Sequence, residues 1–167
     1  VRVETPFGRF VSDYASDPVA VGALAVVVVL LALSLLAPFF APQNPYDLSQ
    51  ISIFDNMLPP GDRSMEGKLY LLGTDDQGRD MLSAMLYGLK LSFFVGIVAT
   101  VTALAIGIAL GITAAYFGGR IDTVIMRIVD LQLSFPAILI ALILLSILGK
   151  GIDKVIIALV AVQWAYY

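Results

Sequence analysis

Two long stretches without a charged residue constrain this chain more than any other feature. Residues 19–40 hold 22 such residues, and residues 91–117 hold 27. At 1.5 Å per residue, the first stretch makes a helix of about 33 Å, enough to cross the hydrocarbon core of a bilayer. Hydrophobic residues are 59% of the chain and charged residues only 14%. The sequence therefore predicts an all-α membrane protein, a polytopic helical bundle with three complete transmembrane helices and the start of a fourth.

The residue types also exclude most chemistry. The sequence has no Cys and no His, which removes disulfides, thiolate and imidazole metal sites and the usual general base. Every Asp and Glu lies outside the apolar runs, whereas an enzyme within the bilayer normally carries an ionisable group in a span. A net charge of -3 offers no basic surface to a nucleic acid. We therefore predict no catalytic residues, no cofactor or metal held by this chain, and no nucleic-acid partner.

The N-terminal half predicts a tail, a span and a loop. Residues 1–18 form a short polar tail, at whose end Asp17 and Pro18 can cap and begin a helix. Residues 19–40 form the first transmembrane helix. A cleaved signal peptide is the alternative, but the apolar run is long for one and its exit suits cleavage poorly. Residues 41–90 form a loop, punctuated by Pro and Gly, that ends in an amphipathic segment.

The second long run carries small side chains at a regular spacing. Five of them recur every four residues, so a helix places them on one face: Ala99, Ala103, Gly107, Gly111 and Ala115. Small residues at this spacing let membrane helices approach backbone to backbone. We predict a helix-packing seam, the alternative being that Ala and Gly are simply common in such helices.

The segment after this run predicts a turn and a new helix. Gly118 and Gly119 end the second span, and Asp122 can cap the next helix. Arg127 and Asp130 lie three residues apart in its first turns, where they either form a pair or are both solvated.

Two further apolar segments complete the chain. Residues 131–148 form the third apolar core, in which Pro136 should kink or restart the helix. A polar turn at residues 149–154 precedes residues 155–167, which begin a fourth span. Residues 91–167 as a whole are the start of a transmembrane core.

A polar turn at residues 72–80 leads into the second span. Gly73 and Gly78 allow backbone angles that other residues resist, and Thr74 or Asp75 can cap a helix start.

The charges that follow predict how this turn is held. We expect an ion pair between Arg79 and Asp80, with solvated charges as the alternative. Residues 81–91 place apolar side chains at helical spacing with Ser83 and Lys90 between them, which predicts an amphipathic segment at a membrane surface that feeds directly into the span.

This stretch resembles the permease subunits of bacterial ABC importers for dipeptides, oligopeptides and nickel, in particular the second, C-type permease. The resemblance rests on Gly73-Thr74-Asp75, Gly78-Arg79-Asp80 and Ser83, then on Tyr87-Gly88, Leu91-Ser92 and Gly96, and later on Asp130 and Pro136. Family members usually have Arg after the Ser and Gly-Ala-Arg before the helix. This chain has Ala84 and Gly88-Leu89-Lys90 at those positions.

The resemblance implies a bacterial cytoplasmic membrane protein with six spans, of which this sequence would be the N-terminal part. It places the tail in the cytoplasm and residues 41–90 outside. Expected partners are a second permease, two ATPase subunits that hold ATP and Mg²⁺, an extracytoplasmic solute-binding protein and the lipid bilayer. The loop would be a spacer between spans or a cap that contacts the binding protein. The coupling loop that begins Glu-Ala-Ala would lie beyond Tyr167.

The function implied is that of a permease subunit of an ATP-driven importer, with the ATP hydrolysis on partner subunits. The sequence has no phosphate-binding loop of the G-x-x-x-x-G-K-[ST] type, which is consistent with this role. A structural membrane subunit without a transport path is the alternative. A channel or secondary transporter would normally show ionisable groups inside its spans. No residue is predicted to contact substrate.

Overall fold

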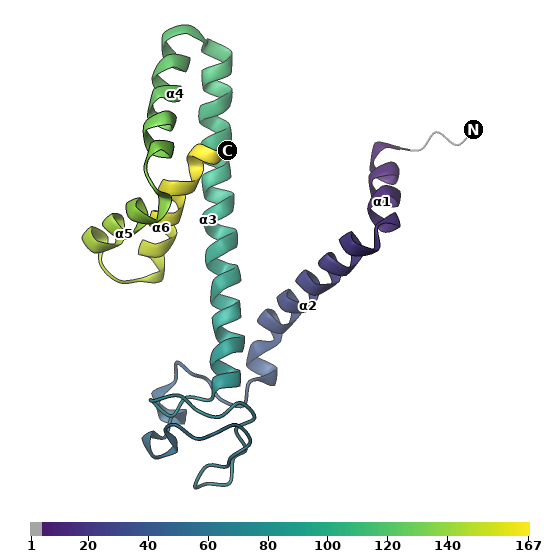
Figure 1. Ribbon diagram of the computed structural model, residues 1–167, viewed down its shortest axis with the longest axis vertical. Helices are drawn as coiled ribbons and strands as arrows, with labels where there is room; N and C mark the ends of the chain where they lie inside the picture. The colour runs from purple at the N-terminus through teal and green to yellow at the C-terminus, as the bar shows by residue number, and fades with distance from the viewer. Residues whose placement is uncertain (1–4) are drawn as a thin grey trace. The chain divides into compact units, whose positions relative to one another are not determined.

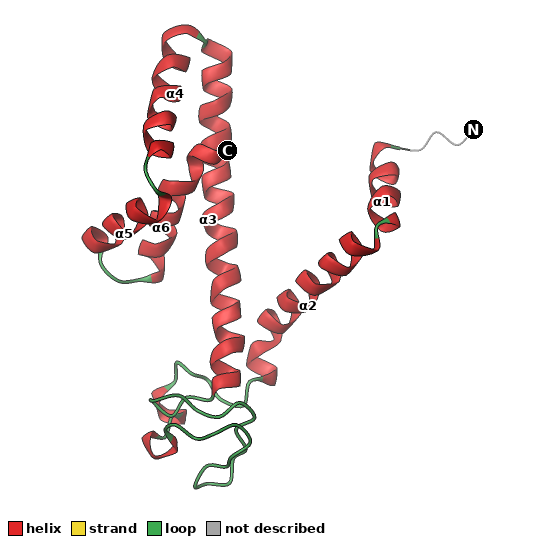
Figure 2. Ribbon diagram, in the orientation of Figure 1, coloured by secondary structure: helices red, strands yellow, loops and turns green. Residues whose placement is uncertain are grey.

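The computed structural model describes residues 5–167, and over these residues the chain is all-α, as predicted (Figures 1 and 2). Two isolated bridges are the only strand-like pairings among the described residues. The helices are α1 (Pro6–Ser16), α2 (Pro18–Phe40), α3 (Met81–Phe117), α4 (Gly119–Ser134), α5 (Ala137–Leu148) and α6 (Ile152–Gln163), with short 3-10 turns η1 (Leu48–Gln50), η2 (Ile53–Asp55) and η3 (Trp164–Tyr166). The chain divides into two compact units, Val1–Leu91 and Ser92–Tyr167.

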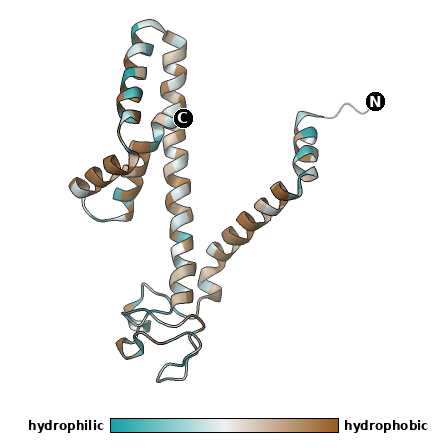
Figure 3. Ribbon diagram, in the orientation of Figure 1, coloured by the Kyte–Doolittle hydropathy of each residue, from teal (hydrophilic) through white to brown (hydrophobic). Residues whose placement is uncertain are grey.

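The helix α2 occupies the first charge-free run. Asp17 caps it, because one carboxylate oxygen accepts hydrogen bonds from the backbone N–H groups of Val19 and Ala20 at 2.9 and 3.4 Å. Pro18 is its first residue, where a missing N–H costs nothing. Pro38 does not end the helix, which continues to Phe40. Its residues are hydrophobic along most of its length (Figure 3), which suits a helix surrounded by lipid.

The predicted tail contains a helix that the sequence analysis did not anticipate. Residues 6–16 form α1, which Thr5 caps through a 3.2 Å hydrogen bond from the backbone N–H of Gly8. The first four residues of the tail lie outside the described part of the chain.

The helix α3 is a single helix of 37 residues. At 1.5 Å per residue its length is about 56 Å, well beyond the roughly 30 Å of a hydrocarbon core. The amphipathic segment at residues 81–91 feeds directly into the apolar run, as predicted. It is not a separate helix lying along a membrane surface, because no break separates it from the rest of α3.

The third predicted span, residues 131–148, is not one continuous helix. α4 ends at Ser134 and α5 begins at Ala137, and the two helices are bent by 91°. Pro136 causes the break, since it has no N–H to donate and stands directly before α5 as its N-cap. Within residues 5–167, α2 and α3 are long and apolar enough to cross a membrane, and the bent pair α4 and α5 makes a third candidate if it is counted as one span.

The structure corrects one predicted detail of α4 and decides between two alternatives for another. Asp122 does not cap the helix, which begins earlier at Gly119 with Gly118 as its N-cap. Arg127 and Asp130 do not pair: both are exposed, and no salt bridge joins them in the described structure. The second of the two alternatives for these charges therefore holds.

The last two helices form a packed pair. α5 and α6 contact each other along their lengths after a turn at residues 149–151. α6 begins three residues before the predicted start of the fourth span and gives way to η3 after Gln163. Gln132 of α4 ties this end of α6, because its Nε2 donates hydrogen bonds to the carbonyls of Ala161 and Val162 at 2.7 and 3.0 Å.

Candidate functional site

The loop between α2 and α3 is held by buried polar side chains. Gln43, just after α2, reaches the start of α3: its Oε1 accepts a 2.7 Å hydrogen bond from the backbone N–H of Asp80, and its own N–H donates to Ser83 Oγ at 3.1 Å. Its Nε2 donates to the carbonyl of Gln50 at 2.5 Å. The three residues Gln43, Asp80 and Ser83 are almost completely buried, and we call them the Gln43 cluster.

Asp80 is the residue that caps α3. Its Oδ2 accepts a 2.8 Å hydrogen bond from the backbone N–H of Ser83, three residues into the helix, and a short one from the Ser83 hydroxyl. Its Oδ1 is buried without a hydrogen-bond partner. The prediction that Thr74 or Asp75 caps the helix is therefore wrong. The N-cap–N3 spacing from Asp80 to Ser83 was the signal that could have identified the cap.

A second buried cluster, centred on Asp55, connects segments in the middle of the loop by hydrogen bonds. The Thr74 hydroxyl donates to the Asp55 carbonyl and accepts a 2.8 Å hydrogen bond from the N–H of Leu58. The Tyr70 hydroxyl donates to Asp55 Oδ2 at 3.3 Å, and the N–H of Met65 donates to Asp55 Oδ1 at 3.3 Å. Burial of the Tyr70 ring, followed by the negative charge of Asp55, raises the pKa of its hydroxyl. Thr74 therefore connects two segments of the loop, through Asp55 and Leu58, and does not start a helix.

Arg79 pairs with Asp75, not with Asp80 as predicted. Arg79 Nε lies 2.7 Å from Asp75 Oδ2, and the backbone N–H groups of Gln77 and Arg79 both donate to Asp75 Oδ1 at 2.9 Å. Partial burial of Asp75 acts to raise its pKa. The hydrogen bonds from the Arg79 backbone and side chain outweigh it, and the pKa lies below its ordinary value. The prediction of Asp80 as the partner of Arg79 is wrong for a geometric reason. The Asp80 carboxylate is directed inward and accepts a hydrogen bond from Ser83, so it is not available to Arg79.

Two motif glycines permit close contacts between loop segments. Gly73 and Gly78 have φ angles of 77° and 78°, in the left-handed region. A Cβ on Gly73 would overlap the carbonyl oxygen of Leu58, and one on Gly78 would overlap that of Ser52. Gly88 differs, since it lies inside α3 with open space around it.

The five residues of the predicted seam are divided between two environments. Ala99, Ala103 and Gly107 are buried on α3. A Cβ on Gly107 would lie 2.6 Å from the carbonyl oxygen of Trp164, so at this point the backbone of α3 directly contacts η3. Gly111 and Ala115 are exposed to a cavity instead.

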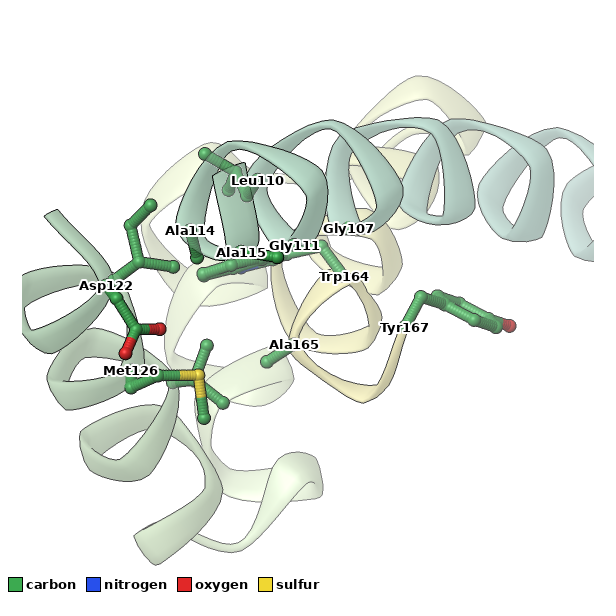
Figure 4. Close-up of a pocket in the computed structure, with 12 residues that line it drawn as sticks. Gly107, Leu110, Gly111, Ala114, Ala115, Asp122, Met126, Trp164, Ala165 and Tyr167 are labelled. Atoms are coloured by element: carbon green, nitrogen blue, oxygen red, sulfur yellow. The ribbon is translucent and has the colours of Figure 1, made fainter. Parts of the chain in front are cut away.

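That cavity has a volume of about 300 Å³ and lies between α3, α4 and η3 (Figure 4). Apolar side chains such as Met126 and Leu110 line most of it, and Asp122 contributes a carboxylate. Trp164 and Tyr167 form the side toward the chain end. Asp130 and Pro136, the last two residues of the family motif, do not line it. No group of three or more metal-binding side chains occurs among the residues that the structure describes.

Comparisons with known proteins match both halves of the chain. Residues 107–167 match the family described as the binding-protein-dependent transport system inner membrane component, and residues 5–60 match the N-terminal TM domain of oligopeptide transport permease C. Together with the apolar helices, these two matches make the chain similar to membrane proteins of the permease class.

Individual relatives agree with these matches. The dipeptide transport system permease protein DppC of Haemophilus influenzae is 32% identical over 164 residues, 98% of this chain and 55% of that protein. The corresponding DppC of Escherichia coli K12 is 38% identical over 98% of this chain and 53% of that protein. The glutathione transport system permease protein GsiD of Pectobacterium atrosepticum is 35% identical over 93% of this chain and 49% of that protein.

Over nearly its whole length the chain is similar to peptide transport permeases of the DppC and OppC type. It spans about half the length of the curated relatives it matches.

Proposed function

We propose that the protein is a transmembrane permease subunit of an ATP-driven importer that takes up dipeptides, oligopeptides or a related small solute. The single observation that carries this is the family match in both halves of the chain, at residues 5–60 and 107–167. The described structure supports it with apolar helices and a loop that contains buried internal hydrogen bonds.

The subunit works with partners in this proposal. ATP and Mg²⁺ bind to two ATPase subunits, and the absence of a phosphate-binding loop from the given sequence is consistent with this. A second permease completes the transport path, and an extracytoplasmic binding protein delivers the solute. The chain lies in the bacterial cytoplasmic membrane with α2, α3 and the α4–α5 pair as its first spans. ATP binding and hydrolysis then drive the two permeases between outward-open and inward-open states.

The loop is the place we assign to contact with the binding protein. Ile53, Phe54 and Met65 are highly exposed on it, although they are large and apolar. Ile53 and Phe54 line a cleft of about 450 Å³ together with Glu66. From the sequence, the loop is either a spacer or a contact surface. Exposed apolar side chains on an otherwise hydrogen-bonded loop favour a contact surface, since a spacer gains nothing from exposing them.

Purification of the protein, expressed from its complete gene, tests the proposal. It is extracted in a mild detergent and its companions are identified by mass spectrometry. Recovery of a second permease and two Walker-type ATPases supports the importer. Recovery of unrelated membrane subunits without any ATPase would refute it in favour of a structural subunit.

Uptake by reconstituted vesicles then identifies the solute. Labelled dialanine, a longer peptide and glutathione are compared, each with its own binding protein and with ATP inside. ATP-dependent uptake of one of them supports transport, and uptake of none in a complex that hydrolyses ATP would exclude this substrate class.

A further inference from the structure

The helix α1 has one largely exposed apolar face that no other described residue covers. Phe7, Phe10, Val11 and Tyr14 follow the i, i+3, i+4, i+7 spacing that places side chains on one side of a helix. Phe7 is 76% exposed and Phe10 is 64% exposed. The opposite side is polar and consists of Arg9, Ser12, Asp13 and Ser16. Such a division on a short helix is typical of helices that lie at the surface of a membrane.

α1 is held against the beginning of α2. Only Asp17 separates the two helices, and its carboxylate caps α2. The Tyr14 hydroxyl donates a 2.8 Å hydrogen bond to the carbonyl of Ala20 in the first turn of α2, and the N–H of Asp17 donates to the carbonyl of Tyr14 at 3.3 Å. The end of α1 therefore lies at the same level as the start of α2.

This level is where the charge-free run of α2 begins. α2 is one of the two single helices in the described residues that can cross a bilayer, and its charge-free run starts at Pro18. A span that begins there places its first turn at the edge of the hydrocarbon core. The end of α1 lies beside the first turn of α2, where apolar side chains such as Val19 are exposed and suit lipid, so the occupant that lies within reach of the apolar face of α1 is lipid.

We propose that α1 is an interfacial helix that lies on the leaflet at the N-terminal end of α2, with Phe7, Phe10 and Val11 inserted among the acyl chains. Buried apolar area drives this insertion. Charge does not, because residues 5–16 contain one Arg and one Asp and have no net charge. Insertion is therefore independent of anionic lipid. Tyr14 acts as the tether that sets the depth of α1 relative to α2.

The chain has no Cys, so that any introduced Cys is a unique labelling site. Spin labels are attached at Phe10→Cys and Val11→Cys, with Ser12→Cys and Asp13→Cys as matched controls from the polar face. The full chain is placed in nanodiscs of neutral phosphatidylcholine. Accessibility is measured to oxygen, which concentrates in acyl chains, and to a water-soluble nickel chelate.

The expected result is a reversal between the two faces. Labels at 10 and 11 favour oxygen and lie roughly 5–10 Å below the phosphates, while labels at 12 and 13 favour the nickel chelate. Preference for nickel at all four sites would show a free arm and overturn the proposal. Protection of sites 10 and 11 from both reagents would show that protein, not lipid, covers this face, and would overturn it equally.

Two further measurements separate the parts of the proposal. Adding phosphatidylglycerol should leave the depth at Phe10→Cys unchanged, and a depth that appears only with anionic lipid would overturn the assignment to apolar area. Tyr14→Phe keeps the ring but removes the hydrogen bond, so the label at site 10 should become more mobile. Unchanged mobility would overturn the role of Tyr14 as a tether.

Discussion

Replacing Gln43 by Leu tests whether the Gln43 cluster fixes the loop to the start of α3. Leu has a similar volume, so that the change removes hydrogen bonds with little loss of packing. It leaves the N–H of Asp80 without an acceptor in a residue that is 1% exposed. The carbonyl of Gln50 also loses a donor, but Gln50 is exposed and water can replace it.

The magnitude follows from the single buried donor. An unsatisfied buried N–H costs about 1–3 kcal/mol. Because 1.4 kcal/mol is a factor of ten, the equilibrium for local opening of the loop should rise about 5- to 150-fold. Opening on this scale exposes amides to exchange well before the chain unfolds as a whole.

Hydrogen–deuterium exchange of the full chain in nanodiscs measures this opening. Peptides that cover residues 41–50 and 79–85 should lose protection by the stated factor, while peptides from α5 and α6 should not change. Gln77→Leu is the matched control, because Gln77 is exposed and contributes only its backbone N–H to a hydrogen bond. Its effect should stay within about 0.5 kcal/mol. Equal exchange in the two variants would refute the role of Gln43.

Three further predictions concern the glycines and the acidic turn. Gly78→Ala should destabilise the loop by about 1–3 kcal/mol more than Gly61→Ala in hydrogen exchange, since both have positive φ but only Gly78 faces a backbone carbonyl. Gly107→Ala should lower the thermal stability of the detergent-solubilised chain, whereas Gly111→Ala, with open space around it, should leave it unchanged. The lowered pKa of Asp75 means that its stabilising contribution is present above its ordinary pKa and is lost as the pH falls through the folded value. Protection of residues 75–79 should therefore fall below about pH 4, and Asp75→Asn should remove this dependence.

Features that depend on neighbouring residues were predictable from the sequence. The cap of α2 by Asp17 and Pro18 follows from the preferences of those two residues at a helix start, and the structure confirms it. The break at Pro136 follows from the missing N–H of proline, although its size, 91°, does not. The apolar face of α1 was also present in the sequence at residues 7, 10, 11 and 14, but the tail was too short and too polar overall to suggest a helix.

Features that depend on distant residues were not predictable in the same way. Arg79 has acidic neighbours at Asp75, Asp76 and Asp80, and nothing in their order selects Asp75. The choice is made by the turn, which directs the Asp75 carboxylate toward two backbone N–H groups and the guanidinium together. Gln43 lies 37 residues from Asp80, outside every motif, and no local pattern marked it.

Gln43 and Gln132 nevertheless share a physical role that explains why both are glutamines. Each pairs with backbone groups at the end of a distant helix: Gln43 with the N–H of Asp80 before α3, and Gln132 with the carbonyls of Ala161 and Val162 in the last turn of α6. Helix ends leave N–H and C=O groups without partners inside the helix, and those groups are costly to bury. A Gln side chain carries both a donor and an acceptor on a long stem, so that it can satisfy either kind of end. The partners of the two glutamines therefore depend on where the helix ends lie in space. A local sequence pattern does not contain that information.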